Sequence, residues 1–286
     1  MPRRRTAREL EAGAAARPAP VAGVAAPDSE PLRMLRRRGL DARPSPPDLP
    51  LPPGAGPELA GAFAARLRHY AFRLFLRGAI LSPRGFAPSQ ATRYVSAAQA
   101  RAYAQDLVEL GIAERLPRGR YRLVRSARSF GGTLEWWLAR ELHERLGLEV
   151  ETGVRSGARG VGGDLDVVAT GEGKLVYVEA KSSPPKHIMV TEVRAFLRRV
   201  RAVRPDVALF VVDTALRLSD KVLPMFAEAL AREAAGAPPA QRVLRDTWAL
   251  GPHLYVANAK EDLVENVCRA VVEGIRALAP GVLPRP

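Results

Sequence analysis

A tight hairpin near the middle of the chain constrains the fold more than any other feature. Residues 164–170 and 174–180 are largely apolar segments of strand length, and a Gly-Glu-Gly turn joins them. Two such segments around a glycine-containing turn predict an antiparallel β-hairpin. Because a fully apolar strand follows at 207–212 and helical patterns lie on both sides, the hairpin is expected to belong to a mixed α/β sheet.

The pattern from residue 131 onward alternates between helices and strands. We expect helices at 133–146, 187–203, 219–233 and 261–278, and further strands at 148–154, 207–212 and 253–257. Between Ser156 and Gly163 the sequence contains four glycines, which predicts either a tight loop or the close approach of a ligand. Residues 131–286 are therefore expected to form one α/β domain.

Residues 57–130 have a different organisation, with helices followed by a hairpin. We expect helices from 57 to about 78, near 88–94 and from 97 to about 110, then strands at 112–116 and 120–124. Ser96 and Gln99 have the spacing of a capping box, which predicts the start of the third helix.

The stretch YVSAAQARAYAQDLVELGIAERLPRGRYRLV resembles the recognition helix and wing of a winged helix-turn-helix domain. The resemblance implies that the start of this helix enters a DNA major groove and that the wing lies against phosphates. Domains of this type also dock proteins or form dimers, and that alternative stays open. The candidate DNA-binding residues are Gln99, Arg101 and Gln105 on the helix and Arg118, Arg120 and Arg122 on the wing.

Positive charge is concentrated in the same region. Residues 57–130 hold 13 Arg and four acidic residues, a net +9 of the chain's +14. Residues 131–286 hold 21 basic and 20 acidic residues, a net +1. Such a local excess favours a polyanionic partner, of which DNA is the first candidate. Residues 1–56, rich in Ala, Pro and Arg, are expected to form a disordered arm.

Charged residues interrupt the two apolar strands of the central hairpin. Asp164 and Asp166 are two residues apart and therefore share one face of their strand, and so do Glu179 and Lys181. Pairing of the strands would bring these groups close together. Because neighbouring carboxylates resist full ionisation unless a cation lies between them, we expect a Mg²⁺ site, which Mn²⁺ would also suit.

These residues resemble the motif of the PD-(D/E)XK nuclease superfamily, and the segment GGDLDVVATGEGKLVYVEAKSS carries the likeness. The resemblance spans roughly residues 130–213 and implies a restriction-endonuclease-like mixed sheet flanked by helices. It implies that Asp166, Glu179 and Glu135, a glutamate on the preceding helix, are catalytic acids that bind metal. Lys181 would be the catalytic lysine, and Asp164 is a candidate further metal ligand.

The sequence departs from that family in two respects. No proline precedes the aspartate, and the glutamine that several branches carry on the helix after the lysine is missing. Thr191 or Glu192 stands near its place. The second departure affects the assignment of a branch more than the expectation of activity.

The leading hypothesis is a metal-dependent DNA endonuclease that a winged helix domain positions on DNA. The bound metal would lower the pKa of a water molecule, and Lys181 would orient that water and stabilise the transition state. The alternative is a DNA-binding regulatory or scaffold protein with an inactive nuclease fold. Plasmid cleavage in Mg²⁺ but not in EDTA would separate the two.

Composition excludes some other classes. No run of about 18 apolar residues occurs, so a membrane-spanning protein is not expected. The single cysteine, Cys268, lies in an apolar helical pattern, which predicts a buried thiol in a cytoplasmic protein without disulfides. A homodimer would allow two active sites to cut both DNA strands.

Overall fold

The expected hairpin lies within an eight-stranded sheet of the computed structural model, which describes residues 28–52, 54–232 and 239–279. β5 (Asp164–Gly171) pairs antiparallel with β6 (Lys174–Lys181). In the turn, Glu172 and Gly173 have positive φ angles of 51° and 70°, as tight hairpins require. β6 then pairs parallel with β7 (Val207–Val212).

The sheet is mixed, with the strand order β1-β4-β5-β6-β7-β10-β9-β8. Strands β6, β7 and β10 are parallel, whereas the other neighbouring pairs are antiparallel. The remaining strands of the sheet are β1 (Ala42–Pro44), β4 (Glu149–Ser156), β8 (Gln241–Leu244), β9 (Thr247–Ala249) and β10 (Leu254–Asn258). The architecture is therefore a large mixed sheet flanked by helices, as expected.

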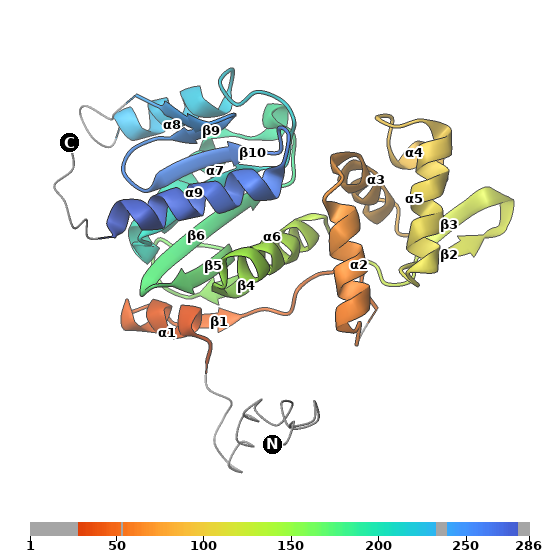
Figure 1. Cartoon of the computed structure of the whole chain (residues 1–286), viewed down its shortest axis with the longest axis horizontal. Helices are drawn as coiled ribbons and strands as arrows, with labels where there is room; N and C mark the ends of the chain where they lie inside the picture. Colours follow the sequence, from red (N-terminus) through yellow and green to blue (C-terminus); the bar gives the residue numbers. More distant parts are fainter. Residues whose placement is uncertain (1–27, 53, 233–238, 280–286) are drawn as a thin grey trace, which may run out of the picture.

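Helices cover both faces of the sheet (Figure 1). One face packs against α6 and α9, and the other against α1, α7 and α8. Because β7 is covered on both sides, all its side chains are buried, which explains its uninterrupted apolar sequence. These helices are α1 (Glu30–Arg37), α6 (Gly131–Leu146), α7 (Val190–Val203), α8 (Val222–Ala231) and α9 (Leu263–Leu278).

The prediction that residues 1–56 form a disordered arm is wrong for the segment from α1 to β1. Leu32 and Leu35 of α1 are buried, and β1 extends the sheet by pairing with β4. The arginines of α1 hide this pattern in the sequence, and the sheet edge supplies the partners that the segment lacks on its own. Residues 1–27 of the predicted arm lie outside the described residues.

Other elements of the sheet body also differ from those expected. β8 and β9 were not predicted, because each is short and β8 leaves Arg242 and Val243 exposed. α7 begins at Val190, since the chain first makes a short 3₁₀ turn, Pro185–His187. None of the described helices has the length and apolar character needed to cross a membrane.

Residues 57–123 form a helical module beside the sheet, with a two-stranded hairpin at its end (Figure 1). The first predicted helix is in fact two, because the chain turns at His69, whose ψ is 113°. Ser96 caps α5 as expected by accepting a hydrogen bond from the Gln99 amide at 3.1 Å. The elements are α2 (Pro57–Leu67), α3 (Tyr70–Ile80), α4 (Pro88–Ala91), α5 (Ala97–Glu109), β2 (Ala113–Leu116) and β3 (Arg120–Leu123).

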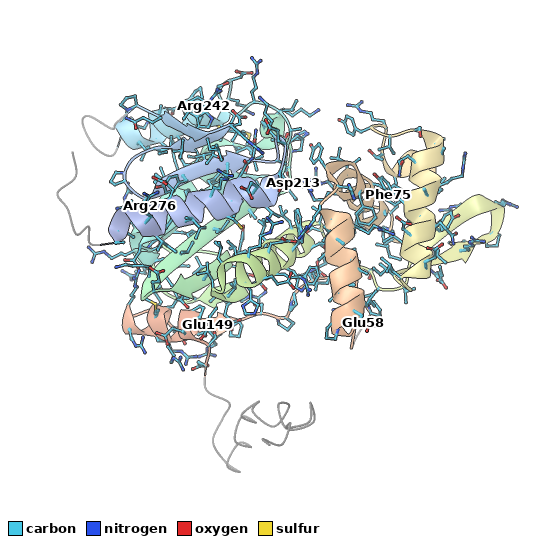
Figure 2. All side chains as sticks on the ribbon, viewed as in Figure 1. Glu58, Phe75, Glu149, Asp213, Arg242 and Arg276 are labelled. Atoms are coloured by element: carbon cyan, nitrogen blue, oxygen red, sulfur yellow. The ribbon has the colours of Figure 1, made fainter. Side chains whose placement is uncertain are left out.

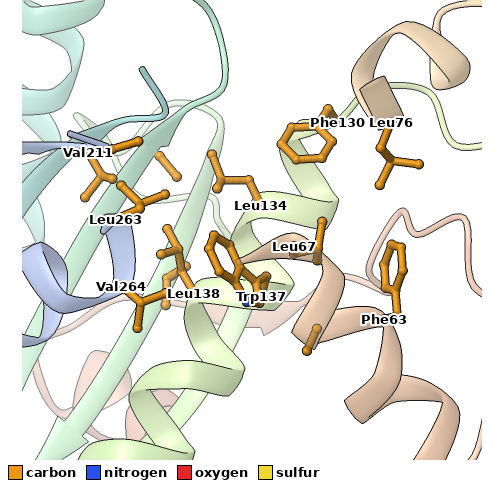
Figure 3. Packing of buried hydrophobic residues seen from close by; sticks show 14 of the residues in the cluster. Phe63, Leu67, Leu76, Phe130, Leu134, Trp137, Leu138, Val211, Leu263 and Val264 are labelled. Carbon is orange, nitrogen blue, oxygen red and sulfur yellow. The ribbon is translucent and has the colours of Figure 1, made fainter. Parts of the chain in front are cut away.

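One hydrophobic core runs from the module into the sheet (Figure 3). The Trp137 side chain of α6 is buried in this core, which includes Leu67 of α2 and Val211 of β7. The Phe63 ring also lies 5.9 Å from the ring of Trp136. The module is therefore packed against the sheet body through apolar contacts.

A buried ion pair also joins the two parts. The Arg73 guanidinium of α3 lies 2.8 Å from Oδ1 of Asp213, which directly follows β7, and both side chains are at most 2% exposed. Arg73 also donates to the Leu67 carbonyl at 2.6 Å and lies over the Trp137 ring. Figure 2 shows Asp213 on the side of the sheet that faces α3. The pair fixes the module beside the ends of β6 and β7.

Candidate functional site

The predicted acids lie on two interior strands, at the end of the sheet where β5 begins and β6 ends. The strand register pairs Val167 with Val178, so one further step places Asp166 opposite Glu179. Oδ2 of Asp166 accepts a hydrogen bond from the Ala180 amide at 2.7 Å. The hairpin therefore brings together the two acids that the sequence places 13 residues apart.

The Glu179 carboxylate is almost completely buried, with 2% of the residue exposed. Its Oε1 lies 2.8 Å from Nζ of Lys181, and both of its oxygens accept from Nη1 of Arg199 at 2.9 Å. The Tyr177 hydroxyl donates to Oε2. Three donors thus hold this carboxylate in place, two of them cationic.

Lys181 lies between two acids and is 21% exposed. Besides Glu179, its ammonium contacts Oε1 of Glu192 at 3.4 Å. Although burial alone would lower the pKa of Lys181, the Glu179 carboxylate and its hydrogen bond raise the pKa above the usual value. Lys181 is therefore a protonated cation, and Glu192 of α7 helps to hold it.

Asp166 and Glu135 share a crowded acidic environment. Burial, followed by the charges of Glu179 and Glu135, raises the pKa of Asp166 well above its ordinary value. Burial, followed by the charges of Glu179 and Asp164, raises the pKa of Glu135 to about 7. The predicted acids on α6, β5 and β6 are thus close enough to disfavour one another's ionisation.

Asp164 is at the rim of this group and is less buried. It forms an ion pair with Arg155 across the β4–β5 ladder at 3.2 Å, and 42% of its side chain is exposed. Together with Glu135, Arg128 and Arg155, it lines a hollow of about 590 Å³. This hollow gives solvent and ligands access to the acidic group.

The chemistry of this group suits a divalent cation, because carboxylate oxygens are the donors that Mg²⁺ and Mn²⁺ prefer. In the conformation described, no three acids, histidines or cysteines of the described residues gather closely enough to hold an ion. Glu179 directs both oxygens to Arg199 instead. The raised pKa values of Asp166 and Glu135 nevertheless indicate a site that a cation would stabilise. The residues therefore fit a divalent ion on condition that Glu179 exchanges its contact with Arg199 for one with the ion.

Arg199 is a site residue that the sequence reasoning missed. Besides holding Glu179, its Nε donates to the carbonyls of Val161 and Gly162, both at 3.0 Å, so it ties the glycine-rich loop to the site. Gly163 has a φ of +84°, and a Cβ there would lie 3.0 Å from Nη2 of Arg199. The sequence contained a signal for this residue. Arg199 follows the apolar Phe196 by three positions, so it is on the face of α7 that packs against the sheet.

The candidate DNA-binding residues divide into two groups. Gln99 and Arg101 of α5 and Arg118 of the hairpin turn are exposed. The other three have side-chain contacts within the module, although Arg120 and Arg122 are exposed as well. These contacts are Gln105 to Glu109 at 3.0 Å, Arg120 to the Gly85 carbonyl at 2.6 Å and Arg122 to Glu114 at 2.6 Å.

Comparisons with known proteins bear on the fold alone. No family model matches the sequence, and neither does any curated protein. The structure resembles protein VC1899 from Vibrio cholerae with a TM-score of 0.52 and 15% identity, over 86% of this chain and 61% of that one. Can2 from Sulfobacillus thermosulfidooxidans, solved in complex with cyclic tetra-adenylate (cA4), gives a TM-score of 0.48 and 15% identity, over 86% and 60%. The chain thus spans about three-fifths of either protein, and the likeness to VC1899 shows a shared fold.

Glu135→Gln is expected to stabilise the protein more at pH 8 than at pH 5. With a pKa raised from 4.5 to about 7, Glu135 binds its proton more tightly in the folded state. The free energy of unfolding of the wild type therefore falls as the pH rises from about 4.5 to about 7, whereas the amide of the variant does not titrate.

Thermal melts in EDTA at both pH values measure this effect as a growing difference in Tm. Glu144→Gln on the same helix is the control, because the Glu144 side chain is 44% exposed. A Tm difference for Glu135→Gln that stays constant with pH would show that Glu135 is not in an acidic, desolvated site.

Proposed function

We propose that this protein is a metal-dependent nuclease that hydrolyses phosphodiester bonds in DNA. The observation that carries the proposal is the placement of Asp166 opposite Glu179, with the Lys181 ammonium 2.8 Å from Glu179 at a sheet edge. The similarity of these residues and Glu135 to the PD-(D/E)XK motif supports it. A large mixed sheet flanked by helices is also the architecture that this resemblance implies.

Each residue of the site would have its own role. Asp166, Glu179 and Glu135 would hold Mg²⁺ or Mn²⁺, with Asp164 as a further candidate at the rim. Such an ion supplies a Lewis acid and lowers the pKa of a bound water. Lys181 would stabilise the negative charge that develops on the phosphate, since its environment keeps it protonated. Glu192 would orient Lys181 from α7.

The helical module would contribute affinity rather than chemistry. Its sequence similarity to winged helix-turn-helix domains and its net charge of +9 over residues 57–130 support a role in DNA binding. Its exposed candidates for contact are Gln99, Arg101, Arg118, Arg120 and Arg122, of which the last two also have contacts within the module. The Arg73–Asp213 pair would hold the module in a fixed position beside the catalytic edge.

A panel of labelled substrates tests this proposal. Linear, nicked, single-stranded and branched DNA, with RNA of the same sequence, are incubated with the protein in Mg²⁺, in Mn²⁺ and in EDTA. Cleavage of at least one DNA in a divalent metal, and none in EDTA, is the expected result. Cleavage that persists in EDTA, or cleavage of RNA alone, would overturn the proposal.

The second candidate function is a DNA-binding regulatory or scaffold protein with an inactive site. The contact of Nη1 of Arg199 with both oxygens of Glu179 favours it, because a guanidinium occupies the carboxylate that a metal would need. Calorimetric titration with Mn²⁺ distinguishes the candidates. Binding that is lost in Glu179→Gln supports the nuclease, whereas DNA binding without metal binding supports the scaffold.

A further inference from the structure

A separate group of cations lies where the parallel strands end. The loops after β6, β7 and β10 enclose a hollow of about 720 Å³ that is distinct from the hollow beside Glu135. Asp220 is the one acid among its lining residues. Its cationic lining residues are Lys186, Arg217, Lys221 and Lys260. Ligands of open α/β sheets commonly bind at this edge, beyond the carboxyl ends of the strands.

The lysines of the chain are concentrated at this hollow. Among the 44 basic residues, five are lysines, and three of those five line it. A fourth, Lys181, ends the strand that leads into it, whereas Lys174 lies at the opposite end of the same strand. Lysine presents a compact charge on a flexible stem, which suits phosphates in varied positions.

The four cations of the hollow lack ion-pair partners among the described residues. In the described parts of the chain, no ion pair joins Lys186, Arg217, Lys221 or Lys260 to a carboxylate. Lys221 donates to the Lys186 carbonyl at 2.8 Å, which holds the two loops together. The hollow therefore offers a surplus of positive charge to an external anion.

Hydrogen bonds fix the loops that present these cations. The Asp213 amide donates to the Lys181 carbonyl, and the Ala259 amide donates to the Thr214 carbonyl, both at 2.8 Å. Nδ2 of the buried Asn258 donates to the Leu216 carbonyl at 2.8 Å. The hollow is therefore preorganised, and it begins beside the strand that carries Glu179 and Lys181.

The hollow also faces the helical module. In Figure 1 the arrowhead of β10 points toward that module. The hydrogen bond from Arg93 lowers the pKa of Tyr94, and the charge of the Lys186 ammonium contributes a smaller part. The Tyr94 residue is 63% exposed, and the Arg93 guanidinium lies 5.2 Å from its ring centroid. An exposed ring beside cations is the arrangement on which single-stranded bases stack.

We propose that this basic hollow binds the phosphates of a single-stranded nucleic acid segment that leads into the Glu179–Lys181 site, with Tyr94 as a stacking surface. The proposal rests on the proposed nuclease function for the direction of the strand. It places part of the substrate contact on the loops after the parallel strands. These contacts would be additional to those of the helical module, which the sequence indicated.

Oligonucleotide binding in EDTA tests the hollow without requiring cleavage. A fluorescein-labelled single-stranded DNA of about 20 nucleotides is titrated at several salt concentrations with wild type and with the triple variant Lys186→Gln/Arg217→Gln/Lys260→Gln. Since each single-strand phosphate contact contributes roughly 0.7 to the slope of log K against log salt, three should remove about 2. The control is Lys174→Gln/Arg242→Gln/Arg276→Gln, which removes the same charge from β6, β8 and α9, elsewhere on the sheet body.

The expected result is an affinity at least tenfold lower and a flatter salt slope for the triple variant alone. Tyr94→Ala should weaken binding about tenfold and leave the slope unchanged, since stacking releases no counterions. Equal slopes in the triple variant and its control would overturn the proposal even if the wild type cleaves DNA. A reduced slope together with no cleavage in Mg²⁺ would support the hollow and reject the nuclease function.

Discussion

Lys181→Ala is expected to slow DNA cleavage by about 10²–10³-fold at saturating substrate in Mg²⁺. The ammonium is held protonated beside Glu179, where it would stabilise charge on the phosphate. Arg199 and Tyr177 still hold Glu179 in the variant, so the fold should persist. Single-turnover rates at saturating DNA measure the loss directly.

Two comparisons make this result specific. Lys174→Ala removes the same charge from the other end of β6 and should leave the rate unchanged. Mn²⁺ affinity of the Lys181→Ala variant, measured by calorimetry, should be maintained, because the ammonium is not a ligand. If metal affinity collapsed while turnover per bound metal stayed normal, the role of Lys181 would be structural.

Asp213→Ala is expected to lower the free energy of unfolding by about 3–5 kcal/mol, the usual cost of breaking a buried ion pair. The substitution leaves the Arg73 guanidinium, of which 2% is exposed, without its carboxylate partner. Arg77 also contacts Asp213, at 3.3 Å, and loses the same partner. Equilibrium denaturation with urea, followed by circular dichroism, measures the change.

Matched variants separate burial from charge. Arg122→Ala breaks an ion pair whose side chains are about half exposed, so its effect should be below about 1 kcal/mol. Arg73→Met/Asp213→Leu removes both buried charges and should be more stable than Asp213→Ala. A loss of less than about 1 kcal/mol in Asp213→Ala would show that the pair does not hold the module to the sheet.

The sequence predicted the central elements well, because their patterns are local. The β5–β6 turn and the apolar β7 strand were recognisable from residue spacing alone, and β7 has the bounds expected from the sequence. Gly147 ends α6 in the left-handed conformation, as its position in the sequence indicated. α1 and β1 escaped prediction because their partners lie on β4, more than 100 residues further along the chain.

The acids of the site could be named from their strand spacing, but their partners could not. Arg199 reaches Glu179 only because α7 packs over β6, a contact between elements that the sequence does not specify. Tyr177, by contrast, lies two residues before Glu179 on the same face of β6. Asp213 likewise looks like a polar residue after a strand until α3 places Arg73 against it. Long-range packing, rather than residue type, assigns these side chains their roles.

Cleavage by the wild type and by Asp166→Asn, purified in parallel, tests the central claim most directly. Supercoiled plasmid and single-stranded DNA are incubated with each protein in Mg²⁺ and in EDTA, and melts confirm that both proteins are folded. The account predicts cleavage by the wild type in Mg²⁺ alone and a loss of at least about 10²-fold in Asp166→Asn. Equal cleavage by the two proteins, or cleavage by the wild type in EDTA, would contradict it.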